Sequence, residues 1–273
     1  MKNQIYQIYY SEVTKSQNDP GFLPLNNLAN ERPDWREYWP IRNYLLNNSL
    51  EEDARYGFFS PKFEAKTTLD SSKVADFIGN DDSDVILFSP YFEQSAFHFN
   101  VFEQLEAAHV GSLKVAQECL RIIRPEIDIL TLIMDSRNTV YCNYFIANKK
   151  FWMKWLAYCE VIYNIAETNS SDLAISLNSE VEYGAGAAPM KVFIIERMAS
   201  FLVTIDKDIK VKSYNPMEIP LGDKVWENFK YDLCILDALK IAFLANPLPD
   251  YAKEFEKRRK KIFNEIIKSL GLN

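Results

Sequence analysis

Segments with strand character alternate along this chain with segments of helical periodicity, and this alternation limits the folds open to it. Five segments have the aromatic and β-branched content of strands: 3–10, 55–60, 84–89, 139–147 and 206–214. Helical spacing is found in the segments between and after them: 33–48, 70–78, 92–109, 112–123, 148–166 and 189–204. Such an order predicts an α/β fold with a mostly parallel central sheet flanked by helices.

The chain contains no composition shift that would mark a linker between domains. We therefore expect one α/β domain over residues 1–222 and a C-terminal helical extension over residues 223–273, packed on the same domain. Two helices, near 223–245 and 250–270, would form that extension. Residues 11–30 read as a loop, because Pro20, Gly21 and Pro24 interrupt regular structure.

Glycine is scarce, with 8 residues in 273, and this excludes the phosphate sites built from glycine-rich loops. The nearest approach to a dinucleotide fingerprint is Gly184-Ala-Gly186, and Pro189 stands where its third glycine would be. Any phosphate binding is therefore left to lysine and arginine side chains.

Charge and cysteine spacing exclude further classes. A net charge of −7 makes the chain as a whole a poor partner for nucleic acid. The four cysteines contain no C-x-x-C pair, which argues for reduced thiols and against structural zinc. The N-terminus lacks the apolar run of a signal peptide, and no stretch of 18 apolar residues occurs, so a cytoplasmic protein is expected.

A basic turn follows the strand-like segment 55–60. Pro61 ends this segment, and Lys62 and Lys66 come directly after it. Beyond the carboxyl end of a parallel strand, two lysines could neutralise a diphosphate. Taken alone, the spacing favours the simpler interpretation of two solvated lysines.

Two further patches combine charge with aromatic or apolar surroundings. Arg36 and Arg42 lie among aromatics in WREYWPIR, where rings could stack on a base or sugar and arginine could pair with phosphate. An aromatic helix packed on the sheet is the alternative. The pair Glu196-Arg197 lies in the apolar segment FIIERM, and such a pair points into a site or forms a salt bridge at the edge of the core.

Glu103, Glu106 and His109 recur at intervals of three and would share one helix face. That face could serve acid/base chemistry or a weak metal site, or it could simply be polar surface. With only two histidines in the chain, a multi-histidine metal centre is excluded. No D-x-D pair follows a strand, since Asp82-Ser-Asp84 precedes one and reads as a solvated turn.

As a set, these segments resemble a known group of proteins. The order IYQIYYSE, RPDWREYWPIRNYLL, YGFFSPKFEAKT, DVILFSPYF, NVFEQLEAAHVG, YCNYFIANKKFW and FIIERMASFLV looks like bacterial proteins encoded among genes for capsule and lipopolysaccharide synthesis. These are similar in plan to GT-A-type glycosyltransferases, which use a nucleotide-sugar donor. The resemblance covers roughly residues 3–204.

The resemblance implies transfer of a sugar from a nucleotide sugar to a glycan or lipid-linked acceptor in surface polysaccharide synthesis. The residues that it suggests for donor binding are Tyr10, Arg42, Lys62, Lys66 and Arg197. For catalysis it suggests Glu196 first and then Glu103 and His109, and for the acceptor Asn143 and Trp152. No residues are assigned to a metal, and Mn²⁺ or Mg²⁺ accompanying the donor remains an open alternative.

Two other classes of function stay open. One is a non-catalytic scaffold of the same pathway, because a high aromatic content also suits a protein interface. The other is a glycoside hydrolase that acts through paired carboxylates such as Glu103 and Glu182.

The C-terminal segment differs in charge from the rest of the chain. Residues 253–268 contain seven lysines and arginines against three glutamates, with an apolar stripe formed by Phe255, Ile262, Ile266, Ile267 and Leu270. A basic amphipathic helix over residues 253–270 could contact an anionic membrane surface. The favoured alternative is a terminal helix docked through its apolar stripe.

Overall fold

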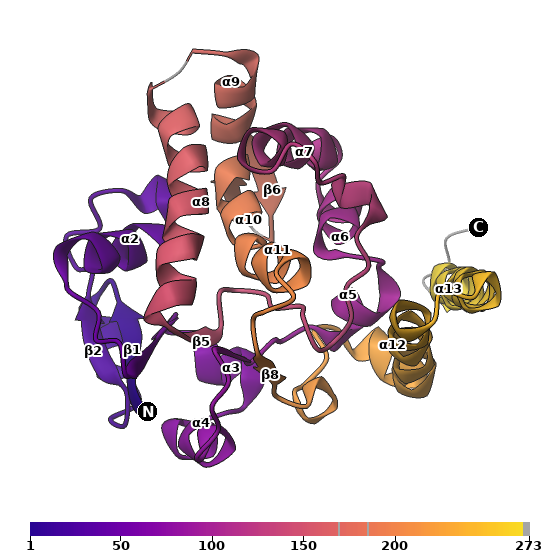
Figure 1. The fold of residues 1–273 in the computed structure, drawn as a ribbon, viewed down its shortest axis with the longest axis horizontal. Coiled ribbons are helices and arrows are strands. Elements are labelled where there is room, and N and C mark those ends of the chain that lie inside the picture. The colour runs from indigo at the N-terminus through magenta and orange to yellow at the C-terminus, as the bar shows by residue number, and fades with distance from the viewer. Residues whose placement is uncertain (169, 185, 270–273) are drawn as a thin grey trace.

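A six-stranded sheet forms the centre of the computed structural model, which describes residues 1–168, 170–184 and 186–269. Helices surround this sheet (Figure 1). In spatial order its strands are β2 (Leu23–Asn26), β1 (Lys2–Tyr9), β3 (Ala54–Phe59), β5 (Phe145–Asn148), β4 (Val85–Leu87) and β8 (Val211–Ser213). The strands predicted from the sequence are all present. Strand β2 was not predicted, because Pro24 is tolerated in this edge strand.

Three of the neighbouring strand pairs are parallel, which confirms the predicted α/β fold with a mostly parallel sheet. Strand β1 runs parallel to β2 and β3, and β4 runs parallel to β8, whereas β5 is antiparallel to both of its neighbours. The antiparallel direction of β5 has a structural consequence. The chain enters β5 at the edge where β1, β2, β3 and β4 end, so the residues just before β5 join that edge.

Thirteen α-helices are described in the three ranges given above, and most follow the predicted spans. They are α1 (Glu12–Ser16), α2 (Tyr38–Asn47), α3 (Phe63–Thr67), α4 (Ser71–Ile78), α5 (Phe92–Phe97), α6 (Val101–Ala108), α7 (Ser112–Ile123), α8 (Lys149–Thr168), α9 (Asp172–Asn178), α10 (Met190–Ile195), α11 (Met198–Ile205), α12 (Lys230–Ala245) and α13 (Pro249–Ser269). Two predicted helices are each divided into two. The segment 92–109 breaks at Asn100, whose side chain caps α6 by accepting from the backbone N–H groups of Phe102 and Glu103.

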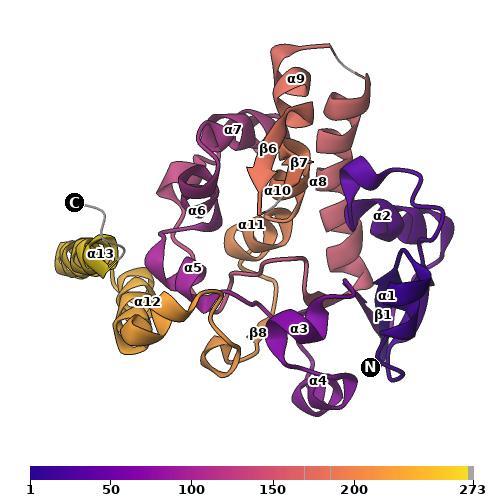
Figure 2. The same ribbon diagram turned by 180° about the vertical axis from the view of Figure 1, so that it is seen from behind.

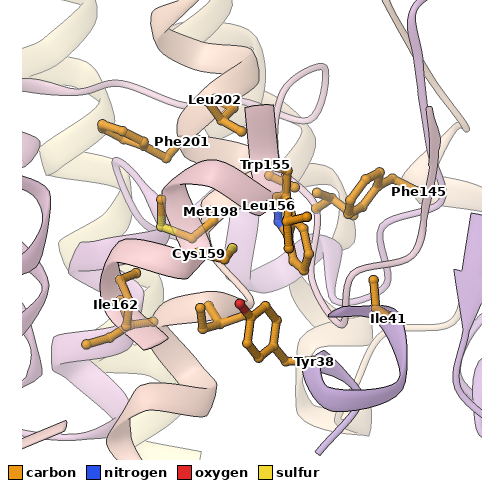
Figure 3. Close-up of a cluster of buried hydrophobic side chains, with 14 of the residues drawn as sticks. Tyr38, Ile41, Phe145, Trp155, Leu156, Cys159, Ile162, Met198, Phe201 and Leu202 are labelled. Atoms are coloured by element: carbon orange, nitrogen blue, oxygen red, sulfur yellow. The ribbon is translucent and has the colours of Figure 1, made fainter. Parts of the chain in front are cut away.

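Helix α8 is the centre of the hydrophobic core. Its buried face, which includes Trp155, Leu156 and Cys159, packs on the sheet side toward Phe145 and on the side of α11 toward Met198 (Figure 3). Aromatic rings dominate this cluster, so many of the aromatic side chains of the sequence are buried here.

Helices α12 and α13 lie together at one end of the molecule, beside α5 (Figures 1 and 2). The predicted apolar stripe of α13 contributes Phe255 and Ile262 to a buried cluster with Leu233 and Leu236 of α12 and Phe92 of α5. Leu270, the last predicted member of the stripe, lies outside the described residues. No helix in the described ranges combines the length and apolarity needed to cross a bilayer.

Two buried polar residues attach α12 to the rest of the fold. The carboxylate of Asp237 accepts two hydrogen bonds, from the backbone N–H of Ser136 at 2.9 Å and from the Ser136 hydroxyl at 2.5 Å. The ammonium group of Lys240 donates to the carbonyl oxygens of Ser95, His98 and Met134, the last two at 2.8 Å and 2.6 Å. Burial lowers the pKa of Lys240 to about 8, so the ammonium form that all three carbonyls require still predominates at neutral pH.

Replacing Lys240 with methionine should destabilise the protein, because three buried carbonyl groups would lose their donor. We expect a loss of about 3 kcal/mol in the free energy of unfolding, measured by urea denaturation at pH 7. Lys253→Met, at an exposed position on α13, is the control and should change stability by less than about 0.5 kcal/mol. Equal effects of the two substitutions would contradict this account of how α12 is attached.

Candidate active site

A cavity of about 660 Å³ opens at the edge of the sheet where the parallel strands end. Tyr10 follows β1, Asn27 follows β2, and Ser60, Lys62 and Lys66 follow β3, and all five line this cavity. This is the edge at which open α/β sheets bind their ligands, since loops from several strands converge there.

The opposite wall comes from three other segments. Arg36 and Glu37 lie between a 3-10 turn (Pro33–Trp35) and α2. Ala188 belongs to a hairpin of two strands, β6 (Glu180–Tyr183) and β7 (Gly186–Pro189), which lies close to α10 in Figure 2. Glu196 stands at the end of α10. The cavity is therefore enclosed by parts of the chain that are far apart in the sequence.

Lys66 is a cation with no nearby carboxylate. Its ammonium group donates to the sulfur of Cys142 at 3.1 Å and lies 5.8 Å from the ring centroids of Tyr91 and Tyr144. Within the described residues no Asp or Glu oxygen lies within 4 Å of it. Burial opposes the charge, but the thiol and the tyrosine hydroxyls raise the pKa of Lys66 overall. Burial also raises the pKa of Cys142 to about 12, so the pair is ammonium and thiol at neutral pH.

Glu196 is the carboxylate most affected by its surroundings. Its side chain is 28% exposed and lies 3.9 Å from the guanidinium of Arg197. Burial raises the pKa of Glu196, Arg197 opposes that rise, and the neighbouring carboxylate of Glu37 adds to it. A raised pKa brings this carboxyl closer to the range in which general bases work.

A partly buried ion network fixes the wall that holds Arg36 and Glu37. Lys191, only 2% exposed, donates to Asp34 at 2.6 Å and to Asn178 at 2.8 Å, and it lies 4.3 Å from the Trp35 ring. Arg32 completes the network by pairing with both Asp34 and Glu167. Although burial acts against it, hydrogen bonds from Arg32 and Lys191 lower the pKa of Asp34 to about 2.

Backbone strain accumulates around the cavity. Arg36, Cys142 and Asn143 have φ angles of 49°, 61° and 55°, in the left-handed region that non-glycine residues rarely occupy. The side chain of Asn143 is buried, and its amide oxygen Oδ1 lacks a hydrogen-bond partner in the part of the chain described. Such strain is typical of functional segments held in place by the surrounding fold.

Four of the residues predicted from the sequence meet at this cavity: Tyr10, Lys62, Lys66 and Glu196. Arg42 lies elsewhere. Its guanidinium pairs with both carboxylate oxygens of Glu160, at 2.6 Å and 2.8 Å, and stacks 4.1 Å from the Tyr163 ring. These contacts occupy Arg42 within the α2–α8 interface.

Three more predicted residues are buried. Arg197 donates to the carbonyl oxygens of Val101 and Phe193, at 3.1 Å and 2.7 Å. Asn143 follows Cys142 at the cavity but does not itself line it. Trp152 is fully buried in the core, where its indole N–H donates to the carbonyl of Tyr56 at 2.8 Å.

The predicted polar face of α6 makes structural contacts. Glu103 accepts from the backbone N–H of Phe99 and pairs with Arg259 of α13 at 2.6 Å. Glu106 accepts from backbone N–H groups at the start of α7. His109 packs against the Phe193 ring, with centroids 4.5 Å apart, and burial lowers its pKa. Nowhere in the described ranges do three or more His, Cys, Asp or Glu gather as metal ligands would.

Sequence reasoning did not select several residues that line the cavity. Asn27, Ser60 and Cys142 each follow or precede a strand at the ligand-binding edge, so the strand-end rule would have found them had β2 and the direction of β5 been known. Arg36 lies in the WREYWPIR patch, but donor binding was predicted for Arg42 and not for Arg36. No sequence pattern singled out Glu37.

Comparisons with known proteins add little. No family model matches the sequence, and no curated protein matches it. The chain is similar to the apo structure of WbbM, a bifunctional glycosyltransferase, with a TM-score of 0.47 and 14% identity. The similarity covers 82% of this chain and 46% of that one, so this chain spans about half the length of WbbM. At this level of similarity, function has to be argued from the cavity itself.

Inorganic pyrophosphate should bind in the cavity through Lys66. We expect Lys66→Met to weaken its binding by at least about tenfold, because a charge-assisted hydrogen bond contributes about 1.5–3 kcal/mol. Lys73→Met, on the neighbouring helix α4, is the matched control and should leave affinity unchanged. Isothermal titration calorimetry at low salt measures both, and equal affinity of all three proteins would contradict an anion site at Lys66.

Proposed function

We propose that this protein is a glycosyltransferase of GT-A type that transfers a sugar from a nucleotide-sugar donor to a glycan or lipid-linked acceptor in bacterial surface polysaccharide synthesis. The observation that supports this most directly is the composition of one cavity. Two lysines that have no carboxylate partner among the described residues line the same space as a carboxyl with a raised pKa, at the ligand-binding edge of the sheet.

In this proposal the donor lies over the ends of β1 and β3. Lys62 and Lys66 neutralise its diphosphate, and Tyr10, whose side chain is 42% exposed, offers a ring for the base or the sugar. Arg42 and Arg197 were expected to share the diphosphate. Their guanidinium groups already donate to protein acceptors, so we assign phosphate binding to the two lysines.

Glu196 is the proposed general base. It would take the proton of an acceptor hydroxyl while that oxygen forms a bond to the anomeric carbon of the donor sugar. The bond between this carbon and the diphosphate oxygen breaks in the same step, and the two lysines stabilise the negative charge on the leaving diphosphate. This sequence inverts the configuration at the anomeric carbon.

A second candidate function is favoured by one specific observation. Glu37 and Glu196 line the same cavity, and paired carboxylates are what a glycoside hydrolase requires. The pair first considered for this chemistry was Glu103 and Glu182. Glu103 is engaged by Arg259, and Glu182 lies exposed on β6, so Glu37 is the better partner for a hydrolytic site.

Thermal stability measured with UDP-, GDP- and CMP-sugars tests the proposed donor site. We expect one nucleotide class to raise the melting temperature, because a ligand that binds only the folded state stabilises it. Parallel measurements with and without Mn²⁺ decide whether a divalent metal accompanies the donor. No shift with any nucleotide, combined with sugar release from a glycan in the absence of nucleotide, would favour the hydrolase.

Glu196→Gln should abolish sugar transfer while making the protein more stable. With its pKa raised in the folded state, Glu196 binds a proton more tightly there than in the unfolded chain, so stability falls as pH rises through that range. Removing the carboxylate should therefore add about 1 kcal/mol at pH 8 and less at pH 4, measured by urea denaturation.

The wild-type transfer rate should fall as pH is lowered through the raised pKa of Glu196, because the base must be ionised. Glu64→Gln, at an exposed glutamate on α3, is the control for both measurements and should change neither. Full transfer by the Glu196→Gln enzyme would remove the catalytic assignment.

A further inference from the structure

Arg36 is a cation in the cavity that the proposed donor site does not use. It comes from the wall opposite β3 and its lysines, and one of its terminal nitrogens donates to the carbonyl oxygen of Ala187 in the β6–β7 hairpin at 3.2 Å. Its side chain is exposed, and the described residues supply no carboxylate within 4 Å of it. Among the described residues, the other two nitrogens of the guanidinium have no acceptor, so an edge of the group remains available to an anion.

The local backbone fixes Arg36 in this position. Its φ angle of 49° is unfavourable for a residue with a side chain, and the ion network of Asp34 and Lys191 holds the segment directly before it. On its other side, the hairpin to which Arg36 donates also contributes Ala188 to the cavity. An arginine whose backbone is held beside an ion network and whose side chain donates to β7 has the features of a recognition residue.

We infer that Arg36, together with Ala187 and Ala188 of β7, forms an acceptor subsite for an anionic saccharide, one that carries a carboxylate or a phosphate. This inference rests on the proposed transferase function, in which Lys62 and Lys66 already account for the charge of the donor. The carboxylates of Glu37 and Glu196 lie in the same cavity and would accept from the hydroxyl groups of that sugar, while Arg36 pairs with its anionic group.

Saccharide binding to the full chain, measured by calorimetry with saturating UDP, GDP or CMP, tests the inference. The probes are trigalacturonate against its methyl ester, and mannose 6-phosphate against mannose, so that the two pairs separate carboxylate from phosphate. We expect one anionic probe to bind at least about tenfold more tightly than its neutral counterpart. Arg36→Gln should remove that difference, Arg36→Lys should retain part of it, and Arg121→Gln, at an exposed arginine on α7, should leave it intact.

Several outcomes would overturn the acceptor subsite. They are equal binding of charged and neutral saccharides, binding of neither, or a preference that survives Arg36→Gln. A further one is an Arg36→Gln protein that loses its discrimination between UDP-glucuronate and UDP-glucose, because the anion recognised would then belong to the donor. Failure of the proposed function is seen separately, as the absence of any nucleotide-dependent shift in melting temperature. The same saccharide titrations repeated without nucleotide then show whether Arg36 still selects an anionic saccharide.

Discussion

The antiparallel pairing of β5 with β3 and β4 is the constraint on which the rest of the structure depends. Strand β5 lies in the middle of the sheet. The chain enters β5 at the edge where the parallel strands end and leaves it at the opposite edge. At its end, Asn148 donates to Asp84 at 2.7 Å and accepts from the N–H of Phe151 in the first turn of α8, the central helix of the core. At its beginning, Cys142 reaches the edge where the parallel strands end. Core and cavity are therefore positioned by one short strand.

Ion pairs, as well as packing, hold the walls of the cavity in place. Part of its far wall comes from residues 33–37, which form a short 3-10 turn and the two residues after it. The pairing of Asp34 with Lys191 and Arg32 holds this segment. A buried lysine of this kind is favourable only while its partners remain in place. The same network includes Glu167 of α8, Asn178 of α9 and Lys191 of α10. The position of Arg36 therefore depends on three elements that are distant from it in the sequence.

Local sequence patterns predicted most elements of this fold, and long-range pairing explains what they missed. The span of α4 follows from its Asp70 cap and that of α7 from its helical periodicity, and both are local signals. The direction of β5 depends on which strands it pairs with, and nothing in residues 139–147 encodes that. Asp84 shows the same limit. It reads as part of a solvated turn, yet it binds the side chain of Asn148 and the backbone N–H of Lys210.

The same reasoning explains why some site residues were identified and others were not. Lys62 and Lys66 follow a recognisable strand, so the strand-end rule applies to them directly. Arg36 and Arg42 are indistinguishable in sequence, since both lie among aromatics. Only the tertiary structure supplies Glu160, which neutralises Arg42 and leaves Arg36 as the cation of that segment that lines the cavity.

The cavity also contains desolvated charged groups and strained backbone. Lys66 is partly buried with a thiol as its hydrogen-bond acceptor, Glu196 is desolvated, and Cys142 and Asn143 have left-handed backbone conformations. The desolvation of Glu196 and the left-handed backbone oppose folding, while the aromatic core around α8 offers the compensating burial. A ligand with an anionic group for the lysine and a hydroxyl for the carboxylate would give both side chains a partner. This coincidence of strain, unpaired charge and location at the strand ends distinguishes the cavity from an ordinary surface depression.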